Sequence, residues 1–218
     1  MNLELHPGGF LAVIGPSGVG KSTLLACLCG MLEPTEGSVS IRSSITGTFM
    51  PPTEVNGCLG IVHQELHLTP NADLLTNVLC GRLGQFQGLR TLFGFPKPLR
   101  TEAYQLLCEL GVGDNPAKWV SQMSGGEKQR VAIARALFQN PDLYFADEPV
   151  SSLDTQTADR MLSRLQVEAR EKQKAVVCVL HEPDHIQRFA DTSLRLNAND
   201  PSGHELTAVQ TELQVAAV

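Results

Sequence analysis

The sequence predicts an α/β fold with a mostly parallel central sheet, a small antiparallel β subdomain and an inserted α-helical subdomain. First, apolar runs of strand length alternate with helical patterns, which is typical of a parallel sheet covered on both faces. Second, a glycine-rich loop joins the apolar run at residues 10–14 to a helix. Third, residues 67–139 show helical patterning without a convincing strand, which predicts a helical subdomain inserted in the core.

The period of the apolar residues predicts each element in order. Strands are predicted at residues 10–14, 59–62, 142–146, 175–180 and 193–196, the last of which is expected to close the sheet. Helices are predicted at residues 21–31, 73–82, 101–110, 126–138, 155–171 and 183–190. The alternating stretches 2–6 and 37–41 predict a short strand and an antiparallel strand pair.

Length and composition indicate one sizeable core. The chain has 218 residues, 42% of them apolar, and we assign residues 1–200 to a single domain and residues 201–218 to a short C-terminal tail. The purely apolar runs, such as residues 175–180, are too short to span a bilayer. The N-terminus lacks the basic start and apolar stretch of a secretory signal, which predicts a cytoplasmic protein.

Charge and cysteine usage argue against nucleic-acid binding and against cysteines that bind a metal or form disulfides. A net charge of -6 gives no reason to expect nucleic acid as a partner. The six cysteines are scattered without a C-x-x-C pair, which indicates buried thiols rather than metal ligands or disulfides. This cysteine usage fits a cytoplasmic placement.

The glycine-rich loop has the spacing that a nucleotide phosphate chain requires. Its residues are Gly15, Pro16, Ser17, Gly18, Val19, Gly20, Lys21 and Ser22, and Thr23 follows. Glycines let the backbone curl until successive N–H groups converge on phosphate oxygens, and the following helix adds its N-terminal dipole. Lys21 is expected to reach the β- and γ-phosphates, and the Ser22 hydroxyl is expected to supply one oxygen to Mg²⁺.

Polar residues follow the predicted core strands where those strands end. Because ligands of parallel sheets bind beyond the carboxyl ends of the strands, Gly15, Gln64, Asp147 and His181 are expected to gather there. Asp147 is expected to hold the metal through its water shell, and the adjacent Glu148 is the candidate general base. His181 is expected to be functional, whereas Gln64 alone is equally consistent with an ordinary loop amide.

A second glycine-containing motif, residues 123–130, opens the helix predicted at 126–138. Ser124 with Glu127 three residues later forms a capping box, which by itself explains these residues structurally. The glycines Gly125 and Gly126 at the helix start also expose N–H groups to an anion. The motif therefore suits a second phosphate contact. His63, His67 and His185 have no comparable sequence context and are interpreted as ordinary.

In these residues and their order, over nearly the whole chain, the sequence resembles the ATP-binding cassette family of P-loop NTPases. Residues 15–22 match its Walker A loop and residues 143–148 its Walker B strand with the catalytic glutamate. The other matches are Gln64 with the Q-loop, residues 124–128 with the signature, residues 151–154 with the D-loop and His181 with the switch histidine.

The resemblance implies ATP and Mg²⁺ as ligands and a head-to-tail dimer with a second ATPase subunit, expected to be a homodimer. ATP would lie between one subunit's Walker A loop and the other subunit's signature. In the signature, Ser124 and Gly126 would contact the γ-phosphate, and Gly125 lies between them in the sequence. Asp154 would cross the interface, and His181 would hold the γ-phosphate and the attacking water. Gln64 would report the nucleotide state to a membrane partner and join Ser22 and Asp147 at the metal.

The resemblance further implies an energy-coupling ATPase of an importer. It would act at the cytoplasmic face of the cell membrane with transmembrane permease subunits and, indirectly, with a periplasmic or extracellular solute-binding protein. Residues 75–84 and 92–95 look like the helical insertion of phosphonate importer ATPases, which predicts phosphonate or a related phosphorus oxyanion. The alternatives are a lipoprotein-release or cell-division ATPase and a soluble cassette ATPase of DNA repair or translation.

The sequence departs from the family pattern at three places. Met123 replaces a leucine, and Glu127 replaces a glutamine and adds a negative charge near a phosphate. The family's aromatic residue that stacks on adenine would lie upstream of the first residue, so the antiparallel subdomain is expected to be N-terminally shortened. The three phenylalanines of the loop at 84–98 are expected to pack on their own domain or to form a docking surface.

Overall fold

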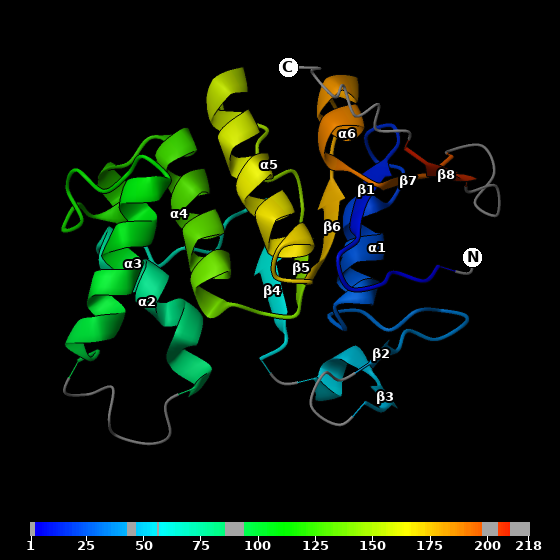
Figure 1. Cartoon of the computed structure of the whole chain (residues 1–218), viewed down its shortest axis with the longest axis horizontal. Helices are drawn as coiled ribbons and strands as arrows, with labels where there is room; N and C mark the ends of the chain where they lie inside the picture. The colour runs from blue at the N-terminus through cyan, green and yellow to red at the C-terminus, as the bar shows by residue number, and fades with distance from the viewer. Residues whose placement is uncertain (1–2, 43–46, 56, 86–93, 198–204, 210–218) are drawn as a thin grey trace, which may run out of the picture.

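The structure, a computed structural model, describes residues 3–42, 47–55, 57–85, 94–197 and 205–209 (Figure 1). Its main sheet has six strands in the order β4-β5-β6-β1-β7-β8. The strands are β1 (Phe10–Ile14), β4 (Leu59–Val62), β5 (Leu143–Ala146), β6 (Ala175–Val179), β7 (Thr192–Arg195) and β8 (Glu205–Ala208). All neighbouring pairs are parallel except β7 and β8. The predicted α/β class with a mostly parallel sheet is confirmed.

The central strand β1 shows why these runs are apolar throughout. It pairs with β6 and β7, with Phe10 opposite Val176 and Leu11 opposite Thr192. Phe10 and Ala12 pack into one core cluster, and Leu11 and Val13 pack into a second cluster. Alternate side chains of the strand thus enter different cores because both faces of the sheet are covered.

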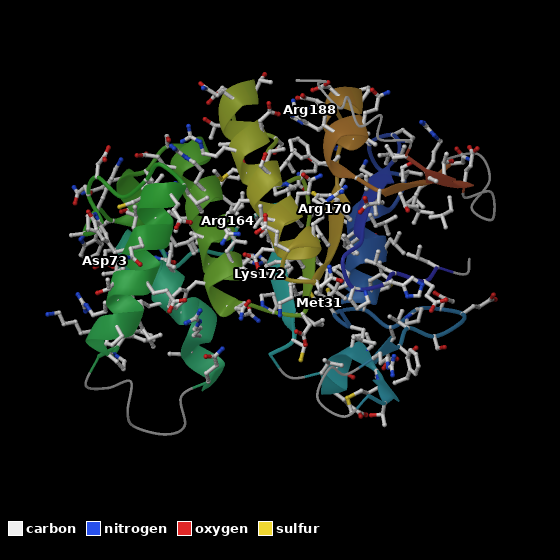
Figure 2. The ribbon with its side chains drawn as sticks, in the orientation of Figure 1. Met31, Asp73, Arg164, Arg170, Lys172 and Arg188 are labelled. Carbon is white, nitrogen blue, oxygen red and sulfur yellow. The ribbon has the colours of Figure 1, made fainter. Side chains whose placement is uncertain are left out.

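The α-helices of the described residues are α1 (Lys21–Leu28), α2 (Leu74–Leu79), α3 (Lys97–Glu109), α4 (Gly125–Gln139), α5 (Thr155–Arg170) and α6 (Pro183–Phe189). Figure 1 shows α2, α3 and α4 gathered beside the β4 end of the sheet. The 3₁₀ helices η2 (Cys80–Gln85) and η4 (Val120–Gln122) complete this part. Asp73, labelled in Figure 2, caps α2 by accepting a hydrogen bond from the Thr76 N–H at 2.6 Å.

A two-stranded antiparallel sheet lies apart from the main one. It consists of β2 (Ile41–Arg42) and β3 (Phe49–Met50), and the 3₁₀ helix η1 (Pro52–Glu54) follows it. This pair confirms the predicted antiparallel element, although the strands begin later than the alternation at residues 37–41 indicated. Within the described part of the chain, no helix has the length and apolar character needed to cross a membrane.

Three predictions about elements were wrong. Residues 3–6 form no strand, and the predicted helix at 21–31 ends at Leu28 because the chain turns at Gly30, which has a φ of 77°. Strand β7 does not close the sheet, since β8 pairs with it in antiparallel register. All four residues of β8 are exposed, so its short alternation of polar and apolar residues packs against no core and is too brief to indicate a strand.

The phenylalanine-containing loop is described only in part. Phe86 and Phe93 lie outside the described residues, whereas Phe95 is partly buried and packs against the main core cluster. For Phe95 the expectation of packing on its own domain is therefore confirmed.

A buried carboxylate fixes α5 on the sheet. Glu168 is 1% exposed and accepts hydrogen bonds from Arg164 at 2.7 Å, Lys172 at 2.8 Å and the Tyr144 hydroxyl at 3.2 Å. Arg164 and Lys172 are labelled in Figure 2. Burial, followed by the Glu168 charge, raises the pKa of Tyr144, so the phenol stays protonated and donates to the carboxylate. Two cations and a hydroxyl thus compensate the charge that α5 buries.

Candidate functional site

The glycine-rich loop, residues 15–20, connects β1 to α1 in a conformation that requires glycine. Gly20 caps α1 with a φ of 105°. Gly15 has a φ of 151°, and a Cβ there would lie 2.8 Å from the carbonyl oxygen of Leu196, so both conformation and space exclude a side chain. Ser17 and Gly18 are exposed at the tip of the loop. The loop therefore presents backbone N–H groups in front of a helix N-terminus.

Lys21 lies under this loop and is only 6% exposed. Its ammonium donates hydrogen bonds to the carbonyl oxygens of Gly15 at 3.0 Å and Pro16 at 2.9 Å. An ammonium has three donors, so one remains for an anion at the loop. Ser22 and Thr23, the next residues of α1, are exposed and can present their hydroxyls to a ligand.

The structure brings Gln64, Asp147 and His181 to one edge of the sheet, since they follow the neighbouring parallel strands β4, β5 and β6. The Asp147 N–H donates to the carbonyl oxygen of Val62 at 2.9 Å, which fixes the end of β5 against β4. Among the described residues, the buried Oδ1 of Asp147 has no hydrogen-bond partner. An unpartnered buried carboxylate oxygen fits a hard cation such as Mg²⁺ or the water shell of one.

Glu148 has an unusual backbone and a close partner. Its φ of 51° lies in the left-handed region, which is costly for a residue other than glycine and is often found at functional sites. Its Oε1 lies 2.7 Å from Nε2 of His181, and the side chain remains 24% exposed. A carboxylate and an imidazole in direct contact, both reachable from solvent, can exchange a proton with a bound water.

A buried glutamine that sequence reasoning missed holds this segment. Gln129 of α4 is 3% exposed, and its Nε2 donates to the carbonyl oxygen of Glu148 at 2.9 Å. Its Oε1 accepts from the backbone N–H of Ser152 at 3.2 Å and also from the Ser152 hydroxyl. The signal in the sequence was weak, because Gln129 is one of several adjacent polar residues in the first turns of the helix.

The segment after β4 also has a strained backbone, and hydrogen bonds from α4 hold it in place. Leu66 and His67 have φ values of 61° and 44°, and Arg135 of α4 donates to both of their carbonyl oxygens, at 2.8 Å and 2.7 Å. Gln64 precedes them and is exposed. His63, interpreted from sequence as ordinary, stacks against His67 with ring centroids 4.5 Å apart. Burial lowers the pKa of His63, with His67 and Arg135 adding to this effect.

The second glycine motif forms the predicted capping box at the start of α4. The Glu127 N–H donates to the Ser124 hydroxyl oxygen at 3.2 Å, and the Ser124 N–H donates to Oε2 of Glu127 at 2.8 Å. Lys118 donates to both oxygens of Glu127, at 2.8 and 3.0 Å. These hydrogen bonds, the one from Lys118 first, lower the pKa of Glu127 to about 2. The carboxylate is thus directed at a cation rather than left free beside Gly125 and Gly126.

The structure does not bring this motif to the glycine-rich loop of the same chain. In Figure 1 the helices α4 and α1, which the two motifs open, lie on opposite sides of the central strands. Asp154 is exposed, and its Oδ1 caps α5 by accepting from the Thr157 N–H at 3.0 Å. Hydrogen bonding with the Thr157 side chain, and then with its backbone, lowers the pKa of Asp154. The two glycine-containing motifs of the chain therefore lie on separate surfaces.

Comparison with known proteins gives the family. A family model described as "ABC transporter" matches residues 1–151. The chain belongs to the ABC transporter family. The phosphonates import ATP-binding protein PhnC 2 of Oceanobacillus iheyensis is 34% identical over 203 residues, which cover 92% of this chain and 80% of that protein. The phosphonates import ATP-binding protein PhnC of Hyphomonas neptunium is 40% identical over 194 residues, covering 87% and 73%.

Solved structures agree with this assignment. A dimeric ATP-binding cassette in a post-hydrolysis state bound to ADP and Pi superposes with a TM-score of 0.80 at 29% identity. The superposition covers 96% of this chain and 89% of that one. A bacterial Atm1-family ABC exporter with ATP bound has a TM-score of 0.71 at 28% identity, covering 93% of this chain and 34% of the exporter. The predicted P-loop NTPase fold is confirmed.

Proposed function

We propose that this chain is the ATP-hydrolysing nucleotide-binding subunit of an importer. The observation that carries the proposal is the contact of 2.7 Å between Glu148 and His181, which follow β5 and β6 at the same sheet edge as the glycine-rich loop. A phosphate-binding loop and a carboxylate–imidazole pair at one edge are the parts that hydrolysis of a bound nucleotide requires. The family assignment supports the same conclusion.

The phosphate chain of ATP would be held by backbone N–H groups of the loop after Pro16, by the free donor of Lys21 and by the hydroxyls of Ser22 and Thr23. Ser22, Gln64 and Asp147 would hold Mg²⁺, directly or through water, and the buried unpartnered Oδ1 of Asp147 supports this set. When bound, the ion would neutralise negative charge on the phosphates. The Lys21 ammonium would add its own positive charge to this neutralisation.

Hydrolysis forms a bond between a water oxygen and the γ-phosphorus and breaks the bond from the γ-phosphorus to its bridging oxygen. Glu148 would orient the water and accept its proton, and His181 would hold the γ-phosphate and the water through its ring nitrogens. The left-handed backbone of Glu148 aims the carboxylate at His181 and away from the β5 strand it follows.

The exposed Ser124 and Gly125, the adjoining Gly126 and the exposed Asp154 suit contact with a second copy of the chain. Each of the two separated surfaces would then complete an ATP site on the partner, which gives a head-to-tail homodimer. Two of the similar solved structures are dimeric cassettes, which supports this arrangement.

The relatives named as phosphonates import proteins support a phosphonate or a related phosphorus oxyanion as the transported solute. The chain would then act at the cytoplasmic face of the membrane with transmembrane permease subunits, and indirectly with a solute-binding protein. Gln64 and the strained segment after it would carry the nucleotide state to the permease.

Glu148→Gln tests the hydrolytic role. The amide cannot take a proton from water, so we expect turnover to fall by about 10²- to 10⁴-fold while ATP binding is retained. The variant is expected to accumulate as an ATP-bound dimer, measured by phosphate release and size-exclusion chromatography with ATP.

Glu171→Gln is the matched control, because Glu171 is an exposed carboxylate at the far end of α5. It should keep wild-type turnover. Wild-type turnover in Glu148→Gln would show that Glu148 is not the general base for hydrolysis.

A further inference from the structure

The residue of interest is Gln129, whose buried side-chain amide makes three hydrogen bonds to the segment after β5. It lies in the second turn of α4, four residues after Gly125, and is 3% exposed. Its nitrogen donates to the Glu148 carbonyl and its oxygen accepts two hydrogen bonds from Ser152. A buried amide with donor and acceptor both satisfied has one orientation, because reversing it would set donor against donor and acceptor against acceptor.

The contact to Glu148 acts on the peptide unit that follows the catalytic side chain. The Glu148 carbonyl oxygen accepts from Gln129 at 2.9 Å and from the Ser151 N–H at 3.3 Å. The backbone φ of Glu148, 51°, is energetically costly and persists only when surrounding contacts hold the residue in place. The Gln129 amide is such a contact, and through the backbone it sets where the Glu148 carboxylate lies relative to His181.

The contact to Ser152 holds the other end of the same segment. The segment from Glu148 to Ser152 is therefore bridged by one side chain of α4. The start of α4 also packs here, since a Cβ on Gly126 would lie 3.1 Å from Leu153 Cδ2 and 3.5 Å from the Ser152 carbonyl oxygen. Gln129 thus ties the helix that carries Ser124 and Gly126 to the segment that carries Glu148 and Asp154.

We propose that Gln129 is a positioning residue for hydrolysis, which holds the Glu148 backbone in its left-handed conformation and thereby places the carboxylate against His181. This inference rests on the proposed role of Glu148. It assigns Gln129 no contact with ATP: the side chain acts only through the Glu148 and Ser152 backbone. Its loss should therefore change the rate of the chemical step and leave nucleotide binding in place.

Two variants separate positioning from simple stability. Gln129→Leu keeps the approximate volume and loses all three hydrogen bonds. Gln129→Glu keeps the acceptor for Ser152 and presents a carboxylate oxygen to the Glu148 carbonyl. Because misplacing a reacting group by about 1 Å can cost about 10²-fold, we expect kcat to fall by roughly 10- to 100-fold in both, with KM for ATP within about threefold of wild type. The purified full-length chain is assayed for phosphate release and ATP-induced dimerisation.

Gln139→Leu is the matched control on the same helix. Gln139 donates to the backbone carbonyl of Leu59 at 2.6 Å and has no contact with the Glu148 segment among the hydrogen bonds of the described residues. It should lower the thermal midpoint and leave kcat of the folded protein unchanged. Gln129→Glu decides the question if Gln129→Leu does not fold, since it keeps a polar, near-isosteric side chain.

Wild-type kcat in Gln129→Glu, or a loss of kcat equal to that of Gln139→Leu, would overturn the positioning role. A raised KM with unchanged kcat would also overturn it. The outcome is separate from that for the proposed function: if Glu148→Gln is inactive and Gln129→Glu is normal, only the present inference fails. If Glu148→Gln is fully active, the proposed function fails whatever Gln129 does.

Discussion

At the scale of single residues, Glu127 and Lys118 show how a departure from a family pattern is compensated. The sequence places a carboxylate where the family has a glutamine, next to a proposed phosphate contact. In the structure both its oxygens are held, by Lys118 and by the Ser124 N–H. The negative charge is thereby paired with a cation from the segment before α4, so the motif keeps its capping geometry.

This pair predicts a specific pH dependence of stability. The pKa of Glu127 is lowered from 4.5 to about 2, so its contribution to stability is fully present above about pH 4.5 and is lost as the pH falls toward about 2. Urea unfolding of wild type and Glu127→Gln should therefore differ by a constant amount above about pH 5, and the difference should shrink below it.

Lys118→Met serves as the control for the same prediction. In the wild-type background it should remove most of this pH dependence, and in the Glu127→Gln background it should have little effect. A difference in unfolding free energy that stays constant from neutral pH down to about pH 3 would contradict the lowered pKa.

Residue-level prediction succeeded where a local motif exists and failed where a contact joins distant segments. The capping box of Ser124 was predicted because its two partners are three residues apart. Gln129 was missed because its partners Glu148 and Ser152 lie on another element. Lys118 was missed because it belongs to an irregular segment. Such a segment has no helical or strand periodicity from which the direction of a side chain could be predicted.

At the scale of elements, α4 connects the helical part of the molecule to the ends of two core strands. Gln129 reaches the segment after β5, Arg135 reaches the segment after β4, and Gln139 reaches the start of β4. The 3₁₀ helix η2 packs closely on the same helix: a Cβ on Gly81 would lie 2.4 Å from the backbone carbonyl oxygen of Arg135.

The close approach at Gly81 gives a prediction about stability. Because a backbone atom cannot move aside as a side chain can, Gly81→Ala should force η2 away from α4 and lower the free energy of unfolding by about 1–3 kcal/mol. Gly84→Ala in the same 3₁₀ helix is the control, since a Cβ added there would have nothing within 4 Å. It should change stability by less than about 0.5 kcal/mol in chemical denaturation. Equal effects of the two substitutions would show that η2 does not pack as described.

Elements buried on both faces were predictable, and exposed ones were not. The strands β1, β4, β5 and β6 were located because a short, continuous apolar run is typical of a parallel strand covered on both sides. Strand β8 carries no such pattern, and its position depends on pairing with β7, including Glu205 opposite Arg195. The end of α1 was placed three residues late because apolar residues continue past the turn at Gly30.

At the scale of the whole molecule, the candidate site exists only in the complete sheet. Residues of the glycine-rich loop follow β1, and Gln64, Asp147 and His181 follow three other strands. Strand β6 lies between β1 and β5 in the sheet, so the loop and Asp147 are brought together by a strand from late in the sequence. The sequence predicted that these strand ends meet, but it could not give the strand order, which depends on long-range pairing.

Because the site is assembled only on folding, ATP should bind the native state and not the unfolded chain. When the free ATP concentration is about 100 times Kd, binding raises the free energy of unfolding by about 2.7 kcal/mol. For a chain of this size this corresponds to a rise in Tm of roughly 5–10 °C. Differential scanning fluorimetry with Mg²⁺ and ATP should show this rise for wild type and less than about 1 °C for Lys21→Met. Equal shifts in both proteins would contradict the role of the Lys21 ammonium.

The position of β1 has a consequence for synthesis on the ribosome. Among the described strands its partners are β6 and β7, with Phe10 beside Val176 and Leu11 beside Thr192, so β1 has no neighbour in the sheet until these much later segments have been made. Such long-range pairing is intrinsically slow, and an unpaired apolar strand is open to wrong partners while it waits. The nascent chain therefore carries the glycine-rich loop on a strand that stays unpaired until β6 has been made.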